Sequence, residues 1–137
     1  TERREIIALA RVFIDRDGKK NSRLADPKRT LGDPRGGCIK IGQIEGDHLN
    51  LAEGFEEAES VIVKFGLPGC WSVNGTELYS RIHIPDHIRS ITIYSQHGKA
   101  ACVGIEKAAP NLERTGRQID IELPPAGGDW NDAWRAL

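Results

Sequence analysis

One acid in this sequence, Glu53, stands where parallel-sheet proteins usually place a ligand. It directly follows a short, mostly apolar run at residues 49–52, which predicts a buried strand, and Gly54 then lets the backbone turn sharply. A helical pattern begins there, with apolar residues at offsets that share one helix face: Phe55, Ala58, Ile62 and Phe65. Glu53 is therefore predicted at the carboxyl end of a strand, the edge where open α/β sheets bind ligands. The alternative interpretation is one solvated acid among several.

Two further groups of residues have spacing that suits a binding role. Gly98 and Lys99 open a predicted helix and could bind phosphate through backbone N–H groups and the lysine charge; the alternative is an ordinary first helical turn. Asp129 and Asp132 follow the last predicted strand, with Asp129 as the N-cap of a short helix. The sequence contains no Walker loop, Gly-x-Ser-x-Gly elbow or Gly-x-Gly-x-x-Gly fingerprint, which removes the main support for P-loop NTPase, serine hydrolase and dinucleotide-binding functions.

The charged residues are unevenly distributed, although the formal net charge is only −1. Residues 16–40 contain eight Lys and Arg against three Asp, whereas residues 41–62 contain six Asp and Glu and no Lys or Arg. A basic arm therefore precedes an acidic site, and solvated surface is the alternative interpretation of both. The residues of this arm expected to contact nucleic-acid phosphates are Arg16, Lys19, Lys20, Arg23, Lys28 and Arg29.

The first 45 residues have the pattern of a small antiparallel sheet. Residues 6–14 are mostly apolar and β-prone, and the Asp17-Gly18 pair that follows is typical of a hairpin turn. The polar return segment contains Pro27 and Pro34, and residues 38–41 alternate as a further strand. We therefore expect an N-terminal antiparallel β extension at residues 1–45.

Strands and helices alternate over the rest of the chain. The predicted strands lie at residues 49–52, 70–73, 91–94 and 118–123. Gly66 is expected to end the first helix and Pro110 the second, and Trp130 begins a third, short helix. This alternation predicts an α/β domain at residues 46–137: a mainly parallel four-stranded sheet flanked by helices.

The composition fits one globular domain of a soluble, cytoplasmic protein. With 137 residues, 39% of them hydrophobic and 28% charged, the chain is long enough to bury a core. Cys38, Cys70 and Cys102 are odd in number and far apart, which argues against a disulfide framework and favours a reducing setting. No apolar run is long enough to span a membrane, and no signal-peptide core is present. The lack of Met and the start at Thr1 fit a domain cut from a longer chain.

The order of these segments resembles the Toprim (Rossmann-like) domain in the form found in primase-like proteins of phages, plasmids and other mobile elements. The residues that carry the resemblance are Leu51-Ala52-Glu53-Gly54-Phe55-Glu56, the strand Ile91-Thr92-Ile93-Tyr94, and Gly128-Asp129-Trp130-Asn131-Asp132. Residues 36–42 and the basic hairpin before them also resemble the segment that precedes Toprim in these proteins. The resemblance covers nearly the whole chain, and its specificity lies in the order and spacing of short motifs.

The resemblance implies that Glu53 acts as a general acid or base, while an Asp-x-Asp pair after a later strand holds Mg²⁺ during nucleotidyl transfer or strand cleavage. This chain departs from that pattern, because it reads Gln96-His97-Gly98 where the pair is expected. An amide and an imidazole are poor substitutes for two carboxylates around Mg²⁺. Asp129 or Asp132 could complete a metal site with Glu53; without them no cofactor is expected.

Three functions are therefore open. The favoured one is a Toprim-fold domain of a primase-like, mobile-element DNA replication protein that binds DNA or RNA through the basic arm and Lys99, with weak or lost metal-dependent catalysis and no membrane partner. The second is an active Mg²⁺-dependent nucleotidyltransferase or nuclease that uses Glu53 with non-standard ligands. The third is a protein–protein module that reuses an inactive Toprim fold against a replication or host protein. All rest on one geometric prediction: Glu53 and the turn at residues 96–98 share one edge of the sheet.

Overall fold

In the computed structural model, residues 5–26, 28–34 and 36–135 are described, together with their side chains except those of Lys28, Trp134 and Arg135. The chain divides into two compact units, Thr1–Arg35 and Gly36–Leu137. None of the helices in these described ranges is long and apolar enough to cross a membrane.

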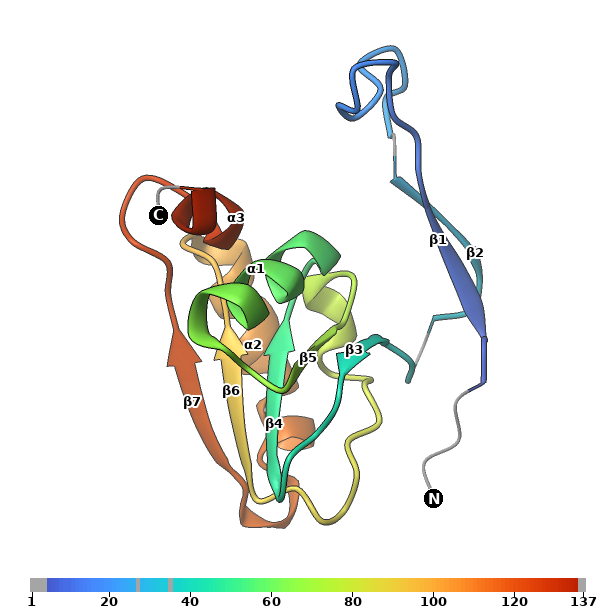
Figure 1. The fold of residues 1–137 in the computed structure, drawn as a ribbon. Coiled ribbons are helices and arrows are strands. Elements are labelled where there is room, and N and C mark those ends of the chain that lie inside the picture. Colours follow the sequence, from blue (N-terminus) through green and yellow to red (C-terminus); the bar gives the residue numbers. More distant parts are fainter. Residues whose placement is uncertain (1–4, 27, 35, 136–137) are drawn as a thin grey trace. The chain divides into compact units, whose positions relative to one another are not determined.

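The first unit is a β-hairpin. Strand β1 (Ala8–Val12) pairs antiparallel with β2 (Lys28–Gly32), as Figure 1 shows. The Asp-Gly turn predicted after β1 is present, because the N–H of Gly18 donates to the carbonyl of Asp15 at 3.0 Å and Gly18 takes a φ of 82°, which favours glycine. The sequence pattern favoured a return strand from residue 19 that leads into a loop, but the order is the reverse: residues 21–26 form a loop that comes before β2.

The second unit is built on a five-stranded sheet of order β3-β5-β4-β6-β7. Its strands are β3 (Ile39–Gly42), β4 (His48–Ala52), β5 (Gly69–Ser72), β6 (Ser90–Tyr94) and β7 (Gln118–Glu122). The last four are parallel, as predicted, and β3 adds an antiparallel edge to β5. Strand β3, which the sequence pattern grouped with the N-terminal extension, thus belongs to the sheet of the second unit, because its hydrogen bonds are made to β5.

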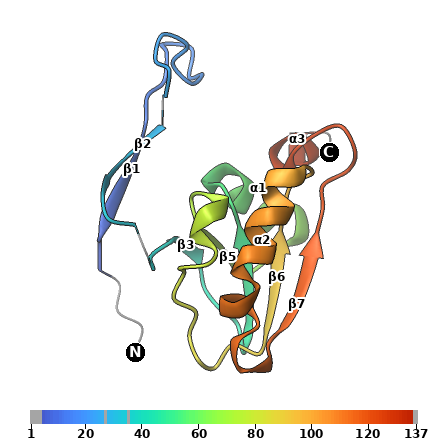
Figure 2. The same cartoon turned by 180° about the vertical axis from the view of Figure 1, so that it is seen from behind.

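Helices cover both faces of this sheet. Helices α1 (Phe55–Phe65) and α3 (Trp130–Arg135) lie on one face, and α2 (Lys99–Leu112) lies on the other, as the two opposite views in Figures 1 and 2 show. Two short 3₁₀ turns, η1 (Thr76–Leu78) and η2 (Arg114–Gly116), complete the unit. Side chains of β4 and β6 alternate between two apolar cores, so that Leu51 and Ile93 pack toward α2 while Ala52 and Tyr94 pack toward α1 and α3. The α/β architecture expected from the sequence is therefore confirmed.

The buried face of helix α1 matches only part of the face that its apolar spacing predicted, since Ala58 and Ile62 pack in the core but the two phenylalanines are half exposed. Its buried residues are Glu57, Ala58, Ser60 and Val61, whereas Phe55 and Phe65 are 41% and 47% exposed. The reason is that α1 packs against α3 as well as against the sheet, so its buried arc is rotated toward both. Phe65 still contacts the rings of Tyr94 and Trp130, with centroids 5.6 and 5.7 Å away.

Helix α2 continues past Pro110, where the sequence predicted its end. Pro110 lacks the N–H group that would donate within the helix, and its ring crowds the carbonyl four residues earlier. The last turn is held by tertiary contacts: Leu112 is 1% exposed, and Nδ2 of Asn111 donates to the carbonyls of Tyr79 (3.1 Å) and Ile82 (3.0 Å). Tertiary packing therefore keeps α2 helical as far as Leu112, although Pro110 favours an earlier helix end.

Candidate functional site

The carboxyl ends of β4, β5 and β6 bring the predicted site residues to one edge of the sheet. Strands β4 and β6 run parallel with Ala52 opposite Tyr94, so Glu53 and Gln96 leave the sheet at the same edge. The end of β5 joins them, because the carbonyl of Glu53 accepts hydrogen bonds from the hydroxyl of Ser72 (3.1 Å) and the N–H of Asn74 (2.7 Å). The geometric prediction made from the sequence is therefore confirmed.

The acid that this edge encloses most completely is Glu57, which lies one helical turn after Glu53. Its side chain is 6% exposed. One carboxylate oxygen accepts a hydrogen bond from the N–H of Gly54 at 3.3 Å, and the other accepts one from Nε2 of Gln96. Gln96 stands where the Toprim pattern expects a metal-binding carboxylate, and it donates a hydrogen bond to Glu57 from its amide nitrogen.

Burial raises the pKa of Glu57 from 4.5 to about 7. The hydrogen bond from Gly54 lowers this pKa, and the nearby negative charges of Glu53, Asp129 and Glu56 raise it. We call these four carboxylates (Glu53, Glu56, Glu57 and Asp129) the acidic edge. Its charge also acts on Tyr79, whose pKa lies well above its ordinary value, first because of burial and then because of Glu53 and Glu57.

The residues after Gln96 tie the edge to β7 and to α2. Nε2 of His97 lies 2.7 Å from the carbonyl of Pro124, so this ring nitrogen carries a proton and donates it to the oxygen. Gly98 has a φ of 121° and precedes α2, whose first residue is the exposed Lys99. Lys99 is therefore at a helix N-terminus, as predicted.

Asp129 and Asp132 cap α3, and their hydrogen bonds are reciprocal. Oδ1 of Asp129 accepts from the N–H of Asp132 at 2.8 Å, and Oδ2 of Asp132 accepts from the N–H of Asp129 at 3.2 Å. This confirms Asp129 as the N-cap. Trp130, 3% exposed, anchors the helix by donating from Nε1 to the carbonyl of Ser95 at 2.9 Å. Helix α3 is thereby fixed beside the loop that carries Gln96.

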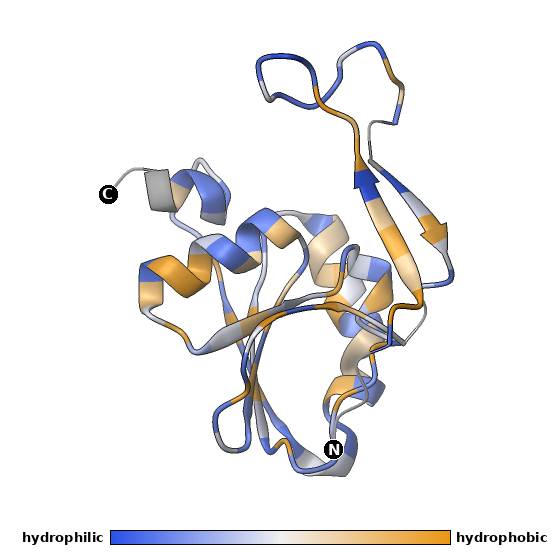
Figure 3. Cartoon of the chain, turned by 45° about the vertical axis from the view of Figure 1, so that its right-hand side comes forward, coloured by the Kyte–Doolittle hydropathy of each residue, from blue (hydrophilic) through white to orange (hydrophobic). Residues whose placement is uncertain are grey.

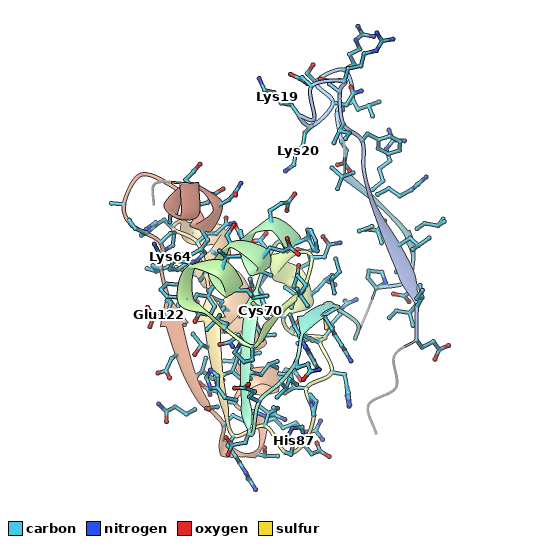
Figure 4. The ribbon with its side chains drawn as sticks, in the orientation of Figure 1. Lys19, Lys20, Lys64, Cys70, His87 and Glu122 are labelled. Carbon is cyan, nitrogen blue, oxygen red and sulfur yellow. The ribbon has the colours of Figure 1, made fainter. Side chains whose placement is uncertain are left out.

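The basic residues of the predicted arm belong to the hairpin unit. The side chains of Arg16, Lys19, Lys20, Arg23 and Arg29 are exposed, whereas that of Lys28 lies outside the described residues. Figure 4 shows Lys19 and Lys20 extending from the loop at the end of the hairpin. Nζ of Lys19 lies 3.7 Å from Oδ2 of Asp17. Both side chains are well exposed, so this ion pair contributes little to stability.

The side chains of the edge do not fit the Mg²⁺ site that the Toprim pattern implies. Mg²⁺ requires several oxygen ligands in near-octahedral geometry. Gln96 and His97 both point hydrogen-bond donors at protein oxygens, and the capping oxygens of Asp129 and Asp132 are engaged by N–H groups. Across residues 5–26, 28–34 and 36–135, no group of three or more His, Cys, Asp or Glu is arranged to hold a metal ion.

Two features of this edge were not predicted from the sequence. The first is the buried pair of Glu57 and Gln96; the four-residue spacing from Glu53 to Glu57, which puts both acids on one side of a helix start, was the available signal. The second is Asn74, whose φ is 61° and whose buried Oδ1 has no hydrogen-bond partner within the described part of the chain. Oδ1 of Asn74 is a single neutral oxygen, and it cannot by itself replace the two carboxylates that a Mg²⁺ site would need.

A comparison with known families identifies the class of this protein. The Toprim domain profile matches residues 48–137, which is more than half of the chain. The chain therefore belongs to the Toprim family, and the resemblance noted in its motifs is confirmed. A search of curated protein sequences found no match.

Three solved structures that match this chain are parts of primases. A DNA primase domain from Pseudomonas aeruginosa matches 97% of this chain with a TM-score of 0.62 and 14% identity, and the primase fragment of the bacteriophage T7 primase-helicase protein matches 94% with a TM-score of 0.61 and 14% identity. The DnaG catalytic core matches 95% with a TM-score of 0.57 and 12% identity. This chain spans 48%, 57% and 48% of those three chains, respectively, so it corresponds to about half of each.

Proposed function

We propose that this chain is the Toprim part of a primase-like DNA replication protein of a mobile element such as a phage or plasmid. In this proposal it binds DNA or RNA, and metal-dependent nucleotidyl transfer at its acidic edge is weak or lost. Membership of the Toprim family and the likeness to primase folds support the replication context.

The observation that carries the proposal is the hydrogen bond from Gln96 to Glu57. In a metal-dependent enzyme the cation would neutralise the mutual repulsion of the carboxylates and bind the substrate phosphates. Here an amide N–H group contacts the most buried acid, and the raised pKa of Glu57 lets a proton neutralise it near neutral pH. The amide of Gln96 and a proton on Glu57 can therefore stabilise the clustered carboxylates of this edge without a cation.

Nucleic-acid binding is proposed for the basic residues rather than for this edge, because phosphates are repelled by carboxylates. The exposed cations of the hairpin, Arg16, Lys19, Lys20, Arg23 and Arg29, suit phosphate contacts that do not depend on sequence, and Lys99 adds one at the start of α2. Such contacts predict an affinity for single strands that falls steeply as salt rises.

Metal titration of the whole chain tests the loss of metal chemistry. We expect the melting temperature and the NMR signals of Glu53 and Glu57 not to change on addition of MgCl₂ or MnCl₂ up to about 10 mM. The matched variant is Gln96→Asp, which adds a carboxylate beside Glu57; it should be less stable without metal and recover when Mg²⁺ is added. A metal response of the unchanged chain would overturn the proposal in favour of an active site built on Glu53, Asp129 and Asp132.

Binding of a labelled single-stranded oligonucleotide tests the other half. We expect measurable affinity at about 50 mM salt and a large loss at about 200 mM. If the chain binds no single strand at low salt, or if its binding is indifferent to salt, the nucleic-acid part of the proposal is wrong.

A further inference from the structure

One face of the hairpin combines two cations, an aromatic ring and an apolar pair. Residues two apart in a strand lie on the same face, so Leu9 and Arg11 share a face with their cross-strand partners Leu31 and Arg29. Phe13 continues this face just beyond β1. We call these five residues the Phe13 face. In Figure 3, β1 and the coil after it are largely orange, that is, hydrophobic, whereas the loop beyond is largely blue.

Both guanidinium groups lie near the ring of Phe13. The Cζ atom of Arg11 is 5.8 Å from the ring centroid and that of Arg29 is 5.4 Å from it, within the range of cation–π attraction. Phe13 is 36% exposed, and both arginine side chains are exposed. The ring and the two charges thus form a single surface that is open to solvent in the hairpin unit.

Apart from its two cation–π contacts, this arrangement does little for the stability of the hairpin itself. Arg11 and Arg29 lie directly opposite each other, and like charges in that position destabilise a strand pair. Leu9 and Leu31 form another opposite pair, 53% and 57% exposed, so their apolar surface stays in water. An anion near the two guanidinium groups would relieve their repulsion, and a flat apolar group would cover the ring.

We propose that the Phe13 face binds single-stranded nucleic acid, with a base stacked near Phe13 and the neighbouring phosphates bound by Arg11 and Arg29. This inference rests on the nucleic-acid binding proposed above and adds the site and the strand type. A nucleotide joins a flat π system to an anion, which matches the two parts of the face. The strand must be single, because the faces of bases in a duplex are already stacked.

Charge complementarity separates this occupant from a second copy of the chain. Two copies facing each other through this surface would bring four arginines together, whereas a phosphate backbone supplies negative charge at every nucleotide. An acidic protein segment would satisfy the charges as well, but it would not depend on an aromatic ring at position 13.

The test separates stacking from charge on the whole chain. With a labelled oligothymidylate of about 15 nucleotides, Phe13→Leu should weaken binding by about fivefold to a hundredfold without changing the salt slope of log Kd. Arg11→Gln should instead reduce that slope by about 0.7. Phe13→Tyr should keep most of the affinity. The control is Phe65→Leu, since Phe65 also has a lysine near its ring, with Nζ of Lys64 5.8 Å from the centroid, but lies in the other unit.

A second measurement uses the unchanged chain. An oligothymidylate carrying 5-iodouracil should crosslink to Phe13 on irradiation, and peptide mass spectrometry identifies the residue. Crosslinks confined to other residues, together with normal affinity of Phe13→Leu, would overturn this inference while leaving the proposed function intact. Absence of any single-strand binding would refute both this inference and the nucleic-acid part of the proposed function. Preferential binding of an acidic peptide, or a concentration-dependent dimer formed through this face, would refute this inference alone.

Discussion

The hairpin and the acidic edge each concentrate charge of one sign, and they accommodate it in different ways. On the hairpin, Arg11 and Arg29 face each other but remain exposed, so water solvates both. At the acidic edge, Glu57 is 6% exposed among like charges, and its negative charge is disfavoured enough to raise its pKa to about 7. Burial, rather than charge density, therefore decides how a cluster of like charges is accommodated. Buried charges need hydrogen bonds or protonation within the protein, whereas exposed charges stay solvated and remain available to a ligand.

The same contrast applies to packing. In the second unit, Ile93 is fully buried between α2 and the neighbouring strands, whereas Leu31 of the hairpin is 57% exposed. A hairpin of two strands has little apolar area to bury and is at best marginally stable by itself. We therefore expect a rigid sheet unit and a hairpin whose order depends more on what it contacts. The following predictions test this comparison.

The largest effect should come from the sheet core. Ile93→Ala leaves a cavity among fully buried side chains and should lower the free energy of unfolding by about 2–5 kcal/mol, as measured by urea denaturation. Leu31→Ala, the matched change on the hairpin, should alter it by less than about 0.5 kcal/mol. Similar losses for the two variants would break the comparison, because they would mean that Leu31 is packed in solution.

The next effect should come from Glu57 and should depend on pH. The unfolded carboxyl titrates near 4.5 and the folded one near 7, so the folded state binds more protons in this window and the stability falls as pH rises through it. Glu57→Gln mimics the protonated acid. The free energy of unfolding of this variant should equal that of the unchanged chain near the low end of the window. At pH 8 it should be higher, by at most about 3 kcal/mol. Thermal unfolding across pH measures this difference; a constant difference would mean that Glu57 stays ionised.

A smaller effect is expected at the start of α3. Asp129→Ala removes the N-cap and should cost about 1 kcal/mol. It should also lower the pKa of Glu57, because one of the charges that raise it is lost. NMR titration of the Glu57 carboxyl reads the second effect separately from stability. If that pKa does not move, Asp129 does not belong to the acidic edge as we have defined it.

The smallest effect on stability should come from the hairpin loop. Lys20→Gln should change the free energy of unfolding by less than about 0.5 kcal/mol, yet reduce the salt slope of single-strand binding by about 0.7 if Lys20 contacts a phosphate. Lys107→Gln on α2, an equally exposed change in the other unit, is the control and should leave the slope unchanged. Equal slopes for both variants would show that the loop does not take part in binding.

Periodicity predicted the elements well where local and tertiary preferences agree. The strands around Leu51 and Ile93 were found within one or two residues, because β-branched and apolar runs suit a buried parallel sheet in any context. The inward face of α1 was predicted only in part, because Ala58 and Ile62 pack in the core but Phe55 does not, and the end of α2 was predicted wrongly. Phe55 is turned outward by the packing of α1 against α3, and Pro110 is tolerated because contacts of Asn111 and Leu112 hold the last turn.

The features of the candidate site also divide into those that the sequence predicted and those that it did not. By itself the sequence determined that Glu53 follows a strand, that Gln96-His97-Gly98 stands where an Asp-x-Asp pair is expected, and that the cations gather in the first part of the chain. Only the tertiary structure decided that Glu57 is the buried acid and Gln96 its hydrogen-bond partner, and that Arg11, Arg29 and Phe13 lie together. The physical reason is that residue type and spacing fix local geometry, whereas burial and partners depend on segments far apart in the chain that meet only when it folds.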